Sequence, residues 1–253
     1  FDSAKRIFQA ADEALEFSIT DLCFNGPEEE LRKTYNTQPA ILTVSIACFE
    51  ILKELGIKPD IVAGHSLGEY SALVAAEAIA FCDAVRLVRK RGQFMQEAVP
   101  LGEGSMAAIM GADRDTVINI CRKTQAELGP VQAVNFNCPG QIVIAGSTSA
   151  VNKAVELLKA AGAKRSVLLP VSAPFHSSLM KPAADRLATE LETVTINNAA
   201  VSVVANVHAR GLTDKHEIKK SLIEQAASPV LWEDCVASII SFGADCFVEI
   251  GRA

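Results

Sequence analysis

The stretch from Ile61 to Ala72, IVAGHSLGEYSA, decides the fold of this chain. Three apolar residues lead into Gly-His-Ser-Leu-Gly, and an alanine-rich run that favours a helix follows at once. A G-x-S-x-G segment between a strand and a helix is a nucleophile elbow, a sharp turn that exposes the serine at its tip. Such a turn leaves no room for a Cβ two residues to either side, so we expect Gly64 and Gly68 to be glycine for steric reasons. The motif predicts that Ser66 is a nucleophile, and an ordinary tight turn with a buried serine is the alternative.

Helical and strand patterns alternate along much of the chain. Apolar residues recur at helical spacing over 1–16, 38–55, 69–76 and 81–98. Residues 60–63 form the short strand that enters the elbow. Later patterns predict a helix over 179–191, a strand over 201–205, a helix over 216–225 and a strand over 246–250. This alternation predicts an α/β fold with a mainly parallel sheet and helices on both faces.

A second pattern interrupts the first after residues 100–104, PLGEG. Strand and helix patterns follow one another at 105–110, 113–128, 131–137, 141–145, 150–161 and 164–169. Their order, β-α-β-β-α-β, is that of a ferredoxin-like unit. We therefore expect a large domain made of residues 1–102 and 172–253, with a small domain inserted at residues 103–171.

The composition excludes several classes of function. The chain has 253 residues, of which 49% are hydrophobic, and this is enough for a sizeable core. Its formal net charge of −6 argues against nucleic acid as the main partner. No uncharged apolar run reaches the roughly 18 residues of a transmembrane helix, so we expect no membrane partner.

Cysteine and histidine occur without the spacing of a metal site. The seven cysteines form no C-x-x-C pair, and an odd number cannot all pair within one chain. Cys48 and Cys246 lie in apolar runs, which is typical of reduced core cysteines in an intracellular protein. The four histidines also lack metal-ligand spacing, so we expect no metal. We expect the protein to be in the cytoplasm, and a location in an organelle is the alternative.

A serine nucleophile needs a base within hydrogen-bond reach. His176 has the best context of the four histidines, because it lies in VSAPFHSSLM (171–180), a loop between a predicted strand and a predicted helix. The alternative is a loop histidine that caps the following helix. We expect His65 to line the pocket or to be structural, and His208 and His216 to face solvent.

The order of these residues separates reaction classes. In an α/β-hydrolase the serine is followed by an acid on a late strand and then by a histidine near the chain end. Here His176 lies between the insert and the last third of the chain, and no obvious aspartate precedes it after a strand. A backbone or amide carbonyl could orient the imidazole instead, which favours a Ser–His dyad.

Further motifs carry a resemblance to a known family. They are GHSLGEYSAL (64–73), RGQFMQEAVP (91–100), VNFNCPGQIVIAG (134–146), AGAKR (161–165), PFHSSLMKPAAD (174–185) and SPVLW (228–232). In their order and spacing, over essentially the whole chain, they resemble the malonyl-CoA:acyl carrier protein transacylases of type II fatty acid synthesis. The resemblance implies an α/β-hydrolase-like large subdomain and a ferredoxin-like small subdomain.

Three residues match the reacting groups of that family. The resemblance implies that Ser66 accepts the acyl group, that His176 is its base, and that Arg91 binds the malonyl carboxylate. A guanidinium suits this task because it pairs with a carboxylate through two parallel hydrogen bonds and stays charged. The alternative for Arg91 is a solvated charge on its helix, as we expect for the basic residues just before it.

The resemblance implies supporting roles for five more residues. The N–H of Leu67 matches one oxyanion donor. The main-chain carbonyl of Gln225 matches the group that orients the histidine, so its side chain is expected to be replaceable. Phe175 matches a residue near the acyl α-carbon, where bulk favours malonyl over methylmalonyl. Asn135 and Asn137 match asparagines near the cleft, and turn residues before a Pro-Gly pair are the alternative.

The implied function is transfer of a malonyl group from malonyl-CoA to the phosphopantetheine thiol of acyl carrier protein, through malonyl-Ser66, for fatty acid synthesis. We expect no cofactor beyond these substrates, acyl carrier protein as the partner, and a monomer. Three alternatives stay open. They are a serine esterase or thioesterase, the acyltransferase domain of a polyketide or multifunctional synthase, and a non-catalytic scaffold for the carrier protein.

The sequence departs from the family at its start. Family members open with a strand and a Gly-Gln-Gly loop whose glutamine supplies a second oxyanion donor, and this sequence has neither. Losing one such donor costs about 10²–10³ in rate. We therefore expect the natural protein to have residues before Phe1, and a targeting segment is neither seen nor excluded.

Overall fold

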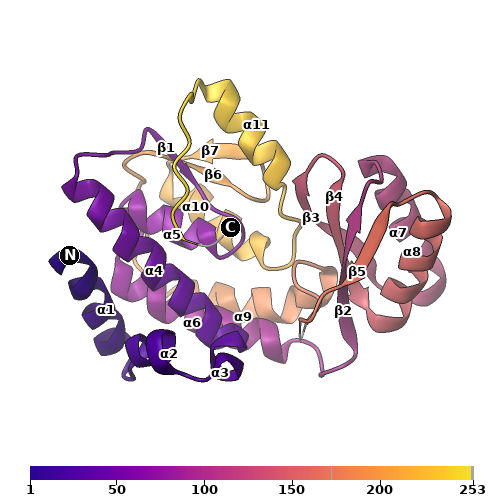
Figure 1. Ribbon diagram of the computed structural model, residues 1–253, viewed down its shortest axis with the longest axis horizontal. Coiled ribbons are helices and arrows are strands. Elements are labelled where there is room, and N and C mark those ends of the chain that lie inside the picture. Colours follow the sequence, from indigo (N-terminus) through magenta and orange to yellow (C-terminus); the bar gives the residue numbers. More distant parts are fainter. Residues whose placement is uncertain (172, 252–253) are drawn as a thin grey trace.

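A computed structural model describes residues 1–171 and 173–251 (Figure 1). Two parts lie side by side in it. The larger part holds most of the helices and a small sheet, and the smaller part holds an antiparallel sheet with two helices. The large domain expected from the sequence, residues 1–102 and 172–253, includes Ser172, Arg252 and Ala253, which lie outside the described residues.

Helices form most of the larger part. Those of its N-terminal half are α1 (Asp2–Leu15), α2 (Ile19–Asn25), α3 (Glu28–Arg32), α4 (Thr34–Glu54), α5 (Gly68–Ala75) and α6 (Phe81–Glu97). Its C-terminal half adds the short 3₁₀ turn η1 (Ser178–Met180), α9 (Lys181–Leu191), α10 (Lys215–Gln225) and α11 (Trp232–Phe242). The expected helices are confirmed, although α4 begins four residues earlier than its periodicity indicated. The sequence pattern did not predict α2, α3 or α11.

The sheet of the larger part brings together strands that are far apart in the chain. It consists of β1 (Ile61–Ala63), β6 (Ser202–Ala205) and β7 (Arg210–Leu212), in the order β1-β6-β7. β1 and β6 are parallel, and β7 runs antiparallel to β6. Only four residues join β6 to β7, too few for a crossover, so β7 must return antiparallel. The expected mainly parallel sheet is thus reduced, in the ranges described, to one parallel pair.

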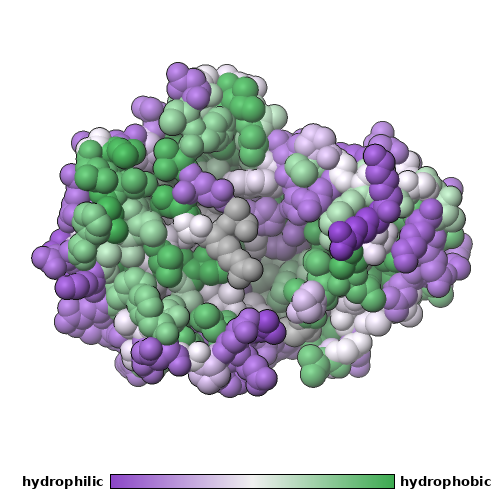
Figure 2. Space-filling model, viewed as in Figure 1, coloured by the Kyte–Doolittle hydropathy of each residue, from purple (hydrophilic) through white to green (hydrophobic). Residues whose placement is uncertain are grey.

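The strand predicted over 246–250 is a further difference. Residues 244–250 form no strand in the structure, and Phe247 and Val248 are exposed. A strand needs the backbone groups of a neighbour, so apolar alternation alone could not decide this segment. On the face of the molecule drawn in Figure 2, apolar residues cover much of the larger part. Cys246 is exposed as well and Cys48 is half-buried, so the expectation of a core position is wrong for Cys246.

The smaller part has the element order that the sequence predicted. Its elements are β2 (Gly104–Met110), α7 (Arg114–Leu128), β3 (Val131–Cys138), β4 (Gln141–Ser147), α8 (Thr148–Ala160) and β5 (Arg165–Leu168). The strands lie in the order β3-β4-β2-β5, with every neighbouring pair antiparallel. Side chains of α7 and α8 pack with one face of this sheet. The other face, with Met106 and Val134, packs against Phe175.

Polar contacts fasten the two parts together near the segment that follows α10. Arg114 on α7 donates two hydrogen bonds, of 3.0 and 2.9 Å, to the carboxylate of Asp234 on α11. Its guanidinium also lies over the ring of Phe136 on β3, 4.1 Å from the ring centre. Val230 extends this contact, because it exchanges backbone hydrogen bonds of 2.8 and 2.9 Å with β3. The smaller part is therefore held close to the end of α10.

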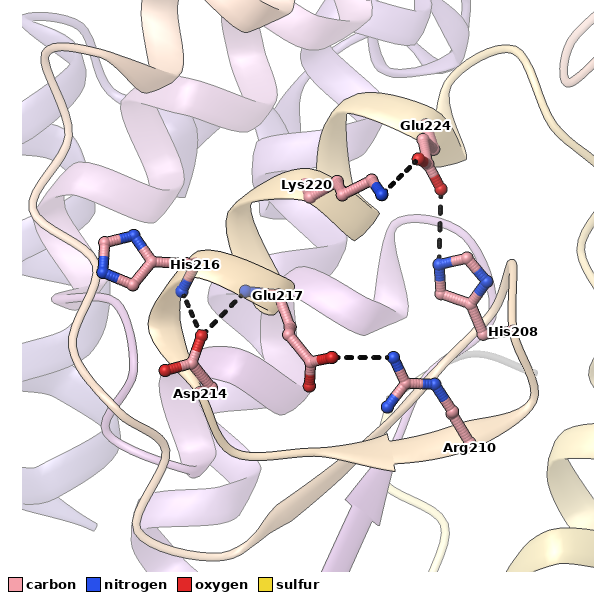
Figure 3. Close-up of polar contacts among 7 residues, drawn as sticks. All are labelled: His208, Arg210, Asp214, His216, Glu217, Lys220 and Glu224. Atoms are coloured by element: carbon pink, nitrogen blue, oxygen red, sulfur yellow. Dashed lines mark hydrogen bonds and ion pairs between the residues drawn. The ribbon is translucent and has the colours of Figure 1, made fainter.

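The helix α10 is anchored at its start and along one side, as Figure 3 shows. Asp214 caps it by accepting the backbone N–H groups of His216 and Glu217. Arg210 of β7 donates to Glu217 at 2.9 Å, and His208 lies 3.3 Å from Glu224. A cap of this kind contributes about 1 kcal/mol to helix stability. These contacts fix the helix whose last residue is Gln225.

The geometry of the elbow requires glycine at one of its two glycine positions. A Cβ on Gly64 would lie 2.0 Å from the backbone carbon and oxygen of Gly68, closer than atoms can approach. A Cβ on Gly68 would meet nothing within 4 Å. The steric requirement expected for both positions therefore holds for Gly64 and not for Gly68.

This difference gives a matched pair of substitutions. Gly64→Ala is expected to lower the free energy of unfolding by about 1–3 kcal/mol or more, as overpacking does. Gly68→Ala should change stability by less than about 1 kcal/mol, because it begins a helix with open space around it. Denaturant unfolding of both variants measures this. Equal damage from the two substitutions would contradict the steric account.

Candidate active site

Ser66 lies at the tip of the elbow, between β1 and α5, in a backbone conformation that residues other than glycine rarely adopt. Its φ is 52°, in the left-handed region, a conformation that costs about 1–3 kcal/mol and persists only where the surroundings enforce it. Asn206, directly after β6, accepts the backbone N–H of Ser66 at 2.6 Å and donates to the carbonyl of Gly64 at 2.8 Å. Gln225 donates to the Ser66 carbonyl at 3.0 Å. The turn is therefore held from both sides.

His176 meets Ser66 from the loop before η1. Its Nε2 is 2.7 Å from Ser66 Oγ, although the two residues are 110 positions apart. Its Nδ1 is 2.9 Å from the main-chain carbonyl of Gln225. A carbonyl oxygen can only accept, so Nδ1 carries the proton and Nε2 is free to accept the serine proton. This is the dyad geometry expected from the sequence, with a carbonyl in place of an acid.

The surroundings keep this imidazole neutral. His176 is 4% exposed. Burial, followed by the charge of Arg91, lowers the pKa of His176 to about 3. A neutral imidazole at physiological pH is the form that can act as a base.

Arg91 points inward from α6 and reaches the nucleophile. It is 2% exposed and donates to Ser66 Oγ at 3.1 Å, to Gln225 Oε1 at 2.9 Å and to Gln38 Oε1 at 2.8 Å. Its guanidinium also lies 5.3 Å from the ring centre of Tyr70. Burial lowers the pKa of Arg91 from its ordinary value, which is high enough that arginine remains charged in proteins. A solvated helix charge is thus excluded for Arg91.

The other basic residues of α6 face outward or contact the helices around them. Arg86 pairs with Asp83, and Lys90 pairs with Glu190. Arg89 lies against the ring of Phe17, 4.2 Å from its centre. The sequence pattern alone did not distinguish these residues from Arg91.

Gln225 makes more contacts than the sequence indicated. It is fully buried, and its side chain binds Arg91 through Oε1 and both the Ser66 carbonyl and Glu69 through Nε2. The expectation that this side chain is replaceable does not fit these contacts. The backbone and the side chain of one residue contact the base, the nucleophile turn and the guanidinium.

Sequence reasoning missed three side chains that support these groups. Gln38 at the second turn of α4 holds Arg91, Asn206 holds the Ser66 turn, and Glu69 on α5 accepts from both Asn206 and Gln225. Two signals were available. Asn206 directly follows a buried strand at the edge where parallel strands end, and Glu69 is the only charged residue of an otherwise apolar or small-residue helix.

The remaining predicted residues lie around the dyad. His65 Nε2 is 2.9 Å from Asn137 Oδ1, and its ring lies 5.6 Å from that of Trp232. Phe175 is half-buried and packs against the cores of both parts. Leu67 precedes α5, and its N–H has no hydrogen-bond acceptor among the residues that the structure covers. This N–H is free to act as the expected oxyanion donor.

Other polar groups lie outside this arrangement. His208 and His216 are exposed, as expected. The positions described contain no cluster of three or more His, Cys, Asp or Glu residues that would suit a metal ion. None of the helices in ranges 1–171 and 173–251 is both long and apolar enough to span a membrane.

The family described as acyl transferase domain matches residues 2–252 of the chain. The chain belongs to this acyltransferase family.

This acyltransferase is similar to the malonyl CoA-acyl carrier protein transacylase of Bacillus subtilis, with 54% identity over 249 residues. The matched region covers 98% of this chain and 78% of the relative. Its fold matches the crystal structure of an acyl carrier protein S-malonyltransferase from Vibrio cholerae, with a TM-score of 0.97, 44% identity, and coverage of 100% and 83% of the two chains. A malonyl-transacylase solved with a type II polyketide synthase acyl carrier protein is also similar, with a TM-score of 0.93, 44% identity, and coverage of 96% and 79%.

The protonation of His176 predicts how the acyltransferase responds to pH. Since burial lowers the pKa of His176 to about 3, the base stays neutral as the pH falls through the ordinary histidine range. The kcat/KM for acylation of Ser66, measured between about pH 5 and 8, should therefore show no histidine limb near 6.5.

Glu69 needs a control in this experiment, because its pKa of about 7 falls in the same range. The profile is therefore also measured in the Glu69→Gln variant. A tenfold loss per pH unit below 6.5 in both proteins would show that His176 titrates normally.

Proposed function

We propose that the protein transfers a malonyl group from malonyl-CoA to the phosphopantetheine thiol of acyl carrier protein, through a malonyl-Ser66 intermediate. One observation carries this proposal. A buried guanidinium, that of Arg91, lies within hydrogen-bond distance of a serine oxygen whose other partner is a neutral imidazole. A nucleophile beside a fixed cation suits an acyl group that ends in a carboxylate.

The first half of the reaction acylates Ser66. Its Oγ attacks the thioester carbonyl of malonyl-CoA while His176 Nε2 takes the hydroxyl proton. The N–H of Leu67 donates to the oxyanion that forms on the carbonyl oxygen. The C–S bond then breaks, and His176 returns the proton to the CoA sulfur.

The second half reverses these steps with a different thiol. The phosphopantetheine sulfur of the carrier protein attacks malonyl-Ser66 after His176 removes its proton. The Ser66 oxygen leaves and regains the proton. The Gln225 carbonyl stabilises the imidazolium in both halves, because it accepts from Nδ1–H at 2.9 Å. No group beyond the thioester donor and the thiol acceptor is required.

Selectivity follows from the buried charge. A malonyl carboxylate can pair with Arg91, whereas an acetyl group would leave the guanidinium with only neutral partners. Phe175, beside His176, supplies the bulk that the resemblance associates with malonyl rather than methylmalonyl.

We assign residues 103–171 to a ferredoxin-like subdomain on their strand order, β3-β4-β2-β5. We assign the larger part to an α/β-hydrolase-like subdomain on the elbow between β1 and α5. The seven free thiols suit a reducing compartment, so we place the protein in the cytoplasm. We also propose that it is a monomer.

Labelled malonyl-CoA tests transfer against hydrolysis. Mixed with the pure protein, it should leave label bound to Ser66 until carrier protein is added, and the Ser66→Ala variant should bind none. A thioesterase would instead release free malonate promptly without carrier protein, and that result would overturn the proposal.

Arg91→Ala tests the role of the guanidinium. Loss of a charge-assisted pair of hydrogen bonds should lower kcat/KM for malonyl transfer by about 10²-fold or more, while acetyl transfer falls less or improves. Arg86→Ala, on the exposed side of the same helix, is the control and should change neither rate. An equal loss for both acyl groups in Arg91→Ala would contradict carboxylate binding.

A further inference from the structure

One buried carboxyl group has no part in the mechanism above. Glu69 lies on α5, three residues after the nucleophile, and is 2% exposed. A single oxygen of its carboxyl, Oε2, accepts the backbone N–H of Asn206 at 2.9 Å and Nε2 of Gln225 at 2.8 Å. Buried carboxyl groups are costly and are retained where their hydrogen bonds are needed.

The contact with Gln225 sets the direction of an amide. The Nε2 end of Gln225 faces two acceptors, the Glu69 carboxyl and the Ser66 carbonyl, while its Oε1 end accepts from Arg91. An amide has one donor end and one acceptor end. If the side chain turned over, its NH₂ group would face the guanidinium, and two donors would meet. The acceptors behind Gln225 therefore keep its oxygen toward Arg91.

The contact with Asn206 acts on the nucleophile. Glu69 fixes the backbone of Asn206 where β6 ends, and the side chain of Asn206 holds the N–H of Ser66 and the carbonyl of Gly64. One carboxyl group thus reaches the strained turn by one route and the guanidinium by another.

Glu69 also supplies negative charge to a buried cation. Among residues 1–171 and 173–251, no carboxylate forms an ion pair with Arg91, and the carboxyl charge that acts on it is that of Glu69. Burial raises the pKa of Glu69 to about 7, although the hydrogen bonds and the charge of Arg91 oppose this. The other titratable groups that sense its charge are Tyr70 and Cys235, and burial raises the pKa of both to about 12, so both stay neutral near pH 7.

We propose that Glu69 is a positioning residue for malonyl transfer: through Gln225 it orients the guanidinium of Arg91, and through Asn206 it holds the Ser66 turn. This inference rests on the proposed function and adds a residue that contacts neither the acyl group nor the base. It also implies that a malonyl carboxylate bound at Arg91 brings a second negative charge near Glu69. Because like charges repel, this binding favours the protonated form of Glu69.

Two substitutions of similar shape separate positioning from packing. Glu69→Gln keeps an oxygen acceptor, and kcat/KM for malonyl transfer should stay within about threefold of the wild type. Glu69→Met keeps the length and removes both acceptors, so the same rate should fall about tenfold to hundredfold, with a smaller fall for acetyl transfer. In a Gln225→Met background, Glu69→Met should add little further loss of selectivity, because the amide between them is gone.

The outcomes distinguish this inference from the function beneath it. If the wild type forms malonyl-Ser66 and Glu69→Met matches it in rate and selectivity, Glu69 has no positioning role and the proposed function stands. Equal losses for malonyl and acetyl that add to those of Gln225→Met would mark a general structural role and overturn the inference. If the wild type forms no labelled malonyl-Ser66, the proposed function itself is wrong, and the inference falls with it.

A second measurement avoids the question of whether Glu69→Met folds. Acylation of Ser66 moves one proton to the CoA sulfur, and a thiol with a pKa of about 8.5 keeps it near pH 7, so the chemistry itself exchanges no net proton. Wild-type protein mixed with malonyl-CoA near pH 7 should therefore take up protons from a dye-monitored solution beyond those taken up by Glu69→Gln. Equal uptake in the two proteins would overturn the coupling of Glu69 to Arg91.

Discussion

The burial of Arg91 is the constraint on which the rest of this structure depends. A guanidinium removed from water is expensive unless its donors are occupied, and no carboxylate in the described part of the chain pairs with it. Its partners are instead neutral oxygens of Gln38, Gln225 and Ser66. Neutral partners leave the positive charge available to a substrate. They also bring the end of α10, the start of α4 and the elbow to one point.

The same arrangement sets the chemistry of the dyad. The charge of Arg91 adds to burial in keeping His176 neutral, and the Gln225 carbonyl selects the tautomer whose Nε2 accepts from Ser66. A main-chain carbonyl can replace the usual acid because it only needs to hold one N–H and stabilise a transient charge. The cap and ion pairs of α10 fix the helix whose last residue carries this carbonyl, so they position it without touching the reacting groups.

Sequence reasoning succeeded where the cause is local and failed where it is not. The elbow, the amphipathic helices and the order of elements in the smaller part follow from spacing along the chain. The loop between a predicted strand and a predicted helix indicated His176, and only the resemblance distinguished Arg91. The Gln225 side chain, Glu69 and Asn206 were missed because their importance lies in contacts across 134 to 159 positions. The strand expected over 246–250 failed for a related reason, since pairing depends on a neighbour that periodicity does not specify.

A crystal structure of the protein soaked with malonyl-CoA tests the central claim most directly. We expect an acyl group joined to Ser66 Oγ, with its carboxylate on the guanidinium of Arg91 and with Gln225 Oε1 still facing that guanidinium. An acyl group on Ser66 whose carboxylate points away from Arg91, with the guanidinium still bound only to Gln38 and Gln225, would contradict the account.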